Sequence, residues 1–69
     1  MKWNVVQNGR MVKTVQNKNR ALAQAMFIAK DIQVTAADKS RLLQIDNGFV
    51  VRFADRQVVI VIEKEKNGI

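Results

Sequence analysis

The sequence predicts an α+β domain with the element order ββαβββ, in which an antiparallel sheet packs against one long helix. Three observations predict this fold. Two Asn-Gly dipeptides, Asn8-Gly9 and Asn47-Gly48, each stand between alternating apolar residues, a pattern typical of type I′ hairpin turns. A stretch between them carries apolar residues at helical spacing. A further apolar run after the second hairpin adds a third strand to a meander.

The first hairpin is expected from residues 2–7 and 10–15. A two-residue loop pairs Val5 with Val12 and Trp3 with Thr14. Each face of this hairpin carries three apolar residues, so the pattern alone leaves the buried face open. We expect Trp3, Val5 and Val12 to face the core, because this choice turns the lysines of the hairpin to solvent.

The single long helix is expected over residues 17–33, with Asn17 or Asn19 as N-cap. Its apolar residues lie within an arc of about 160° at 100° per residue. They are Ala21, Leu22, Ala25, Ile28, Ala29 and Ile32, with Met26 at the edge. Phe27 falls on the opposite side, either as a half-exposed aromatic or as a contact for a partner. In the connection over residues 34–40, Thr35-Ala36-Ala37-Asp38 fits a capping box and predicts one further helical turn.

The meander is expected from residues 41–46, 49–54 and 57–63, with turns at 47–48 and near 55–56. If the second turn also has two residues, one face is core. It carries Leu42, Phe49, Val51, Phe53, Val58, Ile60 and Ile62. A longer turn that shifts the last strand by one residue would exchange its faces.

The reverse face of the meander is also apolar, and one helix can cover only one face. A chain of 69 residues without cysteine has a small core and no disulfide to support it. We therefore expect a homodimer or a higher oligomer that associates through the sheet. The residues predicted for an oligomer or partner interface are Phe27, Leu43, Ile45, Val50, Val59 and Val61.

Charge is divided unequally along the chain. The net charge is +6, and residues 1–30 contain six basic residues and no acidic one. These six residues are Lys2, Arg10, Lys13, Lys18, Arg20 and Lys30. A basic surface without acids is the electrostatic pattern of a phosphate-binding protein, so the sequence favours a small protein that binds DNA or RNA. The alternative is a protein-interaction module, an adaptor or inhibitor, that docks through an apolar sheet face or an edge strand. An acidic protein partner would suit it.

The composition argues against an enzyme. Cysteine, histidine and tyrosine are absent and Ser40 is the only serine, so the common nucleophile–base pairs cannot be built. The carboxylates are scattered without metal-loop spacing, so no metal or cofactor is expected. No apolar run approaches the ~18 residues of a membrane span, so no membrane association is expected and the default location is cytoplasmic. We expect one domain over residues 1–66, with a frayed tail at 67–69.

The opening of the chain, Trp3-x-Val5-Val6 with Gly9 and Val12, is followed by an alanine-rich helix. It resembles the ββα pattern of several small bacterial domains and, in style, short accessory proteins of phages and mobile elements. This resemblance implies no activity.

Overall fold

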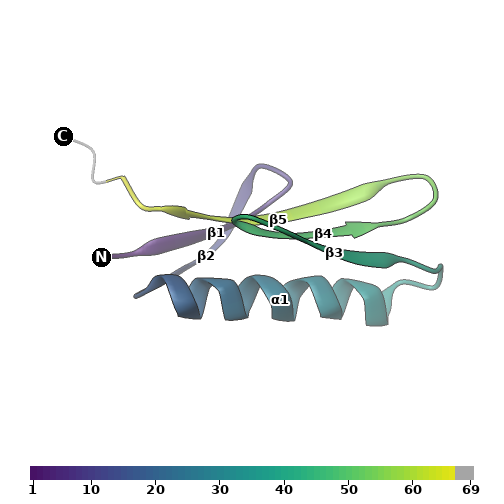
Figure 1. The fold of residues 1–69 in the computed structure, drawn as a ribbon, viewed down its shortest axis with the longest axis horizontal. Helices are drawn as coiled ribbons and strands as arrows, with labels where there is room; N and C mark the ends of the chain where they lie inside the picture. Colours follow the sequence, from purple (N-terminus) through teal and green to yellow (C-terminus); the bar gives the residue numbers. More distant parts are fainter. Residues whose placement is uncertain (67–69) are drawn as a thin grey trace.

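A computed structural model describes residues 1–66, and it confirms the α+β fold with the order ββαβββ (Figure 1). The elements are β1 (Trp3–Gln7), β2 (Arg10–Val15), α1 (Lys18–Thr35), β3 (Arg41–Ile45), β4 (Gly48–Arg52) and β5 (Gln57–Lys64). The strands form one antiparallel sheet in the order β2-β1-β5-β4-β3, and α1 covers one face of it. The chain thus crosses the full width of the sheet through the helix. The tail predicted at 67–69 lies outside the described residues.

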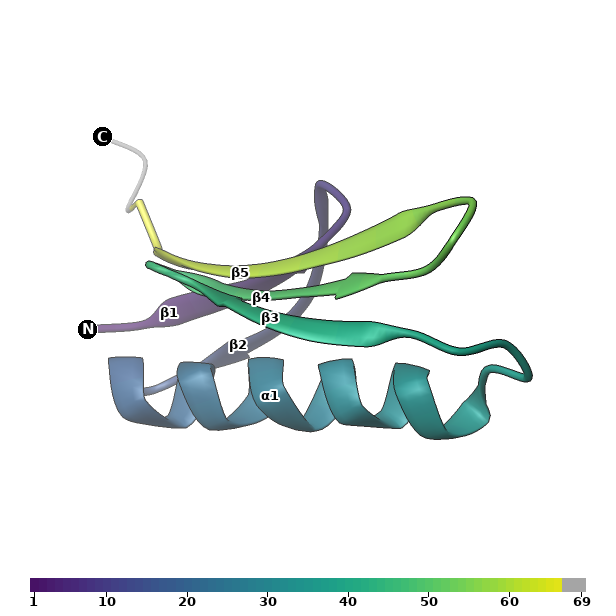
Figure 2. The same ribbon diagram turned by 45° about the vertical axis from the view of Figure 1, so that its right-hand side comes forward.

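The first hairpin turns at Asn8-Gly9 as predicted. Asn8 (φ 49°) and Gly9 (φ 83°) both have positive φ, which a type I′ turn requires. The Asn8 side-chain oxygen accepts a hydrogen bond of 2.8 Å from the Val59 N–H, which ties the loop to β5. In Figure 2 this loop rises away from α1.

A β-bulge in this hairpin makes part of the predicted pairing wrong. The register holds at Val6 and Met11 but shifts between Val5 and Val6, so Val5 faces Lys13 and Trp3 faces Val15. The one-residue shift moves Val15 toward the core and leaves Val12 48% exposed rather than buried.

The second hairpin turns one residue earlier than predicted. Its loop is Asp46-Asn47, and Gly48 already pairs with Ile45 as the first residue of β4. A Cβ built on Gly48 would lie 2.0 Å from the Ile60 carbonyl oxygen. Glycine is therefore needed here because β5 passes so closely, not because the turn requires positive φ.

The connection between β4 and β5 is longer than the predicted two-residue turn. Arg52 is the last residue of β4 to pair with β5, opposite Gln57, and the Phe53 N–H bonds the Arg56 carbonyl across the loop. Both meander registers therefore differ from the prediction by two residues. An even shift keeps every side chain on its predicted face. Phe49, Val51, Phe53, Ile60 and Ile62 are all buried under α1, with Leu42 and Val58 packed against them.

Helix α1 begins after Asn17, whose side-chain oxygen accepts a hydrogen bond of 2.9 Å from the Arg20 N–H. Ala21, Ala25 and Ala29 are fully buried, and these small side chains let the helix lie close on the phenylalanines of the sheet. The helix ends at Thr35, two residues later than expected. The further helical turn predicted from Thr35 to Asp38 is absent from the described chain, because the Thr35 hydroxyl bonds back to the Asp31 carbonyl inside α1.

Candidate nucleic-acid interface

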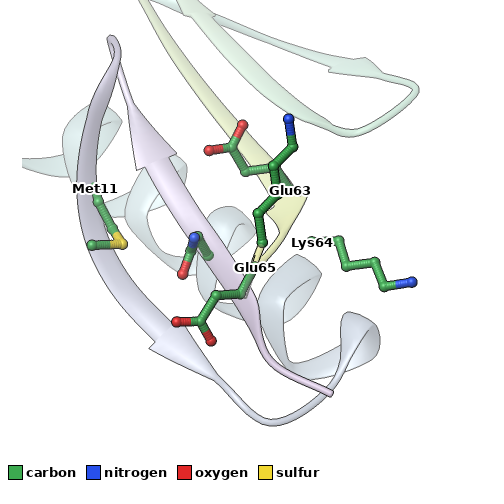
Figure 3. A pocket seen from close by; sticks show the side chains of 6 residues that line it. Met11, Glu63, Lys64 and Glu65 are labelled. Carbon is green, nitrogen blue, oxygen red and sulfur yellow. The ribbon is translucent and has the colours of Figure 1, made fainter. Parts of the chain in front are cut away.

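The alternation of β5 sorts charge between the two faces of the sheet. Glu63, Lys64 and Glu65 follow one another, so the lysine and the glutamates point to opposite sides. Lys64 pairs with Trp3, which packs against the core on the helix side, whereas Glu63 pairs with Asn4. Figure 3 shows Glu63 and Glu65 on the side of Met11, with Lys64 directed away from them.

On the helix side, two cations stand in the first turn of α1 and two more on strands of the sheet that it covers. Lys18 lies in the first turn, with its Nζ 5.7 Å from the centre of the Trp3 ring. Lys64 lies on β5 opposite Trp3, and Lys13 lies on β2 opposite Val5. Both side chains are therefore on the helix side of the sheet. We call the surface formed by Lys13, Lys18, Arg20 and Lys64 the basic end. All four residues are exposed.

The first turn of α1 contains no acidic residue. Lys18 and Arg20 instead stand where the helix dipole is positive, an arrangement that lowers helix stability. The unpaired N–H groups of a first turn add to the positive potential of the two side chains. The basic end is therefore electrostatically suited to anions such as phosphate groups.

Only half of the six predicted cations are part of the basic end. Lys13, Lys18 and Arg20 belong to it, whereas Lys30 lies about 18 Å further along the helix. Arg10 adjoins the raised hairpin loop. Lys2 is at the same end of the molecule, but its carbonyl accepts a hydrogen bond of 3.0 Å from the Glu65 N–H, so an acidic residue is its neighbour.

Lys64 is not among the six predicted cations, because these all lie in the acid-free residues 1–30. The alternating run Glu63-Lys64-Glu65-Lys66 at the end of a strand was the signal that could have revealed it. The pairing of β1 with β5 also brings Glu63 and Glu65 next to residues 2–4. Residues 1–30 contain no acid in sequence, but they have acidic neighbours in space.

The predicted interface residues separate into two surfaces. Leu43, Ile45, Val59 and Val61 lie on the sheet face opposite α1. Val50 belongs to the same face but is only 8% exposed, so its neighbours in the same chain already cover it. Phe27 is 68% exposed on the outer side of α1, across the molecule from them. It therefore cannot share an interface with the sheet residues on one chain.

One hollow in the described surface adjoins the basic end at Lys64. This shallow hollow of about 580 Å³ lies at the end of the sheet, lined by Asn4, Met11, Glu63, Lys64, Glu65 and Lys66 (Figure 3). Among residues 1–66, no three acidic side chains cluster as metal ligands. Within residues 1–66, no helix combines the length and the apolar character that are needed to cross a membrane.

No family model matches the chain, and searches of curated proteins and of solved structures give no significant match. Any proposal about function therefore rests on the charge and shape of the surface alone.

Proposed function

We propose that this protein binds nucleic acid through the phosphate backbone, at the basic end. The observation that supports this proposal is the placement of Lys13 and Lys64 on the helix side of the sheet and of Lys18 and Arg20 in the first turn of α1, which contains no acid. Cations in this position lower the stability of the helix, and such a cost is typical of functional surfaces. Phosphate contacts of this kind bind without sequence preference.

Binding that rests on phosphate contacts weakens steeply with salt, because each contact releases counterions. The double variant Lys13→Ala/Lys64→Ala is expected to lower the slope of log affinity against log salt concentration by about 2. A titration with random duplex or single strands can be followed by the fluorescence of Trp3, the only tryptophan. This ring lies within the basic end, where binding should change its emission.

The matched control is Lys30→Ala/Lys39→Ala, which removes the same charge from exposed positions outside the basic end. It is expected to change the slope much less. An equal loss in both variants would mean that net charge alone attracts the nucleic acid. Failure of the wild type to bind at about 0.15 M salt would overturn the proposal.

The alternative, a protein-interaction module, draws support from the outer side of α1. Phe27 is 68% exposed and Val34 is 82% exposed, and their spacing of seven residues puts them on one stripe of the helix. A protein that docks there would lose affinity in Phe27→Ala and keep it in Lys13→Ala/Lys64→Ala. Retention on heparin at about 0.15 M salt would favour nucleic acid instead.

A further inference from the structure

The sheet face opposite α1 carries a continuous apolar surface with no layer over it in the described chain. Cross-strand pairs place its members on one face, from Met11 and Val6 through Val61 and Val59 to Val50. We call this surface the apolar strip. Its residues are Val6, Met11, Leu43, Ile45, Val59 and Val61, which surround Val50, itself only 8% exposed. Met11 is 61% exposed and Ile45 is 36% exposed, so the strip reaches solvent at both of its sides.

Opposite charges flank the strip at its two ends along the strands. At one end Arg41 pairs directly with Arg52. Like charges across a strand pair repel, and no acidic side chain in residues 1–66 forms a salt bridge with either arginine. At the other end stand Glu63 and Glu65. Arg52 pairs with Gln57, and the six residues from there to Glu63 span about 20 Å.

The edges of the sheet are less suited to association than this face. The edge strand β2 carries the register shift of the bulge, which interrupts regular pairing with another strand. The opposite edge strand, β3, begins with the charged residue Arg41. Both features are means by which natural sheets prevent edge-to-edge pairing.

We propose that the apolar strip is covered by a second copy of this chain, packed face to face with its strands running in reverse. A two-fold axis across the strands lays the Arg41–Arg52 end of each copy over the Glu63 end of the other, while the strips meet in the middle. A two-fold axis along the strands would instead place the arginine ends of both copies at the same end of the dimer, away from Glu63. The charge pattern therefore selects the first arrangement, as an isologous interface requires self-complementarity.

Glu63 is the main acidic contact in this arrangement. It pairs with the neutral Asn4, so no cross-strand cation competes for it. Glu65 lies beside Lys2, to whose carbonyl its N–H is bonded, and part of its charge is offset there. The charge test therefore uses Arg52 and Glu63.

The wild type is expected to sediment as a dimer, at twice the 7.9 kDa of one chain, over tens of micromolar. Arg52→Glu and Glu63→Arg each place like charges together twice in the symmetric dimer. Each single variant is expected to raise the dimer dissociation constant about tenfold or more. The double variant Arg52→Glu/Glu63→Arg restores opposite charges and is expected to return the constant toward that of the wild type.

Lys30→Glu is the control for Arg52→Glu, because it makes the same change of charge on α1, away from the strip. Circular dichroism of each variant shows whether the fold is retained, and recovery in the double variant excludes misfolding as the cause. A wild type that stays at the mass of one chain would overturn the proposal. A dimer that responds to Arg52→Glu no more than to Lys30→Glu would overturn it too.

Discussion

Two glycines that follow asparagine have different physical roles in this protein. Gly9 has a φ of 83° with no atom within 4 Å of an added Cβ, so only the backbone conformation favours glycine there. A Cβ on Gly48 would collide with the backbone of Ile60. The sequence predicts the same turn at both dipeptides. The close approach of β5 to Gly48 involves Ile60, 12 residues later, and leaves no signal in the local sequence.

This difference predicts unequal costs of substitution. Gly9→Ala is expected to lower the free energy of unfolding by about 1–2 kcal/mol, the cost of a left-handed conformation with a Cβ. Gly48→Ala is expected to cost about 3 kcal/mol or more, because β4 and β5 must move apart. Urea denaturation of both variants measures this, and equal losses would contradict the close approach.

Asp38 and Arg56 form an ion pair of 2.9 Å between the connection that follows α1 and the β4–β5 loop. The hydrogen bond from Arg56 holds the pKa of the Asp38 carboxyl below its usual 3.8. The ionised carboxylate therefore adds stability at neutral pH, and this contribution is lost as the pH falls through the lowered pKa. The gain is small, since both side chains are about half exposed.

We expect Asp38→Asn to be slightly less stable than the wild type at pH 7, and this difference to shrink and vanish as the pH falls through the lowered pKa of Asp38. Urea denaturation across this pH range checks this. Asp46→Asn is the control, because Asp46 forms no salt bridge within residues 1–66. A difference that persists at low pH would show that the pair is not its source.

Among the elements, α1 has the least favourable charge distribution for its own stability. Arg20 occupies the third position after the Asn17 cap, where glutamate would complete a capping box and complement the dipole. We expect Arg20→Glu to raise the free energy of unfolding by about 0.3–1 kcal/mol. The same change should weaken nucleic-acid binding.

Thermal unfolding and the duplex titration, run on one preparation of Arg20→Glu, measure both effects. Arg20→Gln removes the charge without adding a carboxylate. Its stability and its affinity for nucleic acid should fall between those of the wild type and of Arg20→Glu. A variant that is more stable and binds as well as the wild type would show that Arg20 has no part in binding.

The strands show which errors of sequence interpretation matter. The meander registers differ from expectation by two residues, and every core side chain of β4 and β5 still lies on its predicted face. In the first hairpin a shift of one residue was enough to exchange Val12 for Val15. Period-two patterns thus determine faces well, but a bulge has no signature where both faces are equally apolar.

For the whole molecule, element order and core followed from the sequence because apolar periodicity is a local property. The grouping of charge did not, because the pairing of β1 with β5 joins residues about sixty positions apart. That pairing adds Lys64 to the basic end and places Glu63 and Glu65 on the other side of the sheet. The net charge of each half of the chain does not show which face of the sheet a charged side chain occupies. The alternation of charges within a strand does.

The central place of β1, between β2 and β5, also affects how the chain folds during synthesis. Val5 leaves the ribosome long before Ile62, its partner in β5. At about 5–20 residues per second, β1 waits roughly 3–11 s for that partner. A two-stranded hairpin is only marginally stable in water during this interval. Folding of the nascent chain is therefore delayed until its last strand is made, and a ribosome stalled before β5 would hold an incomplete, aggregation-prone sheet.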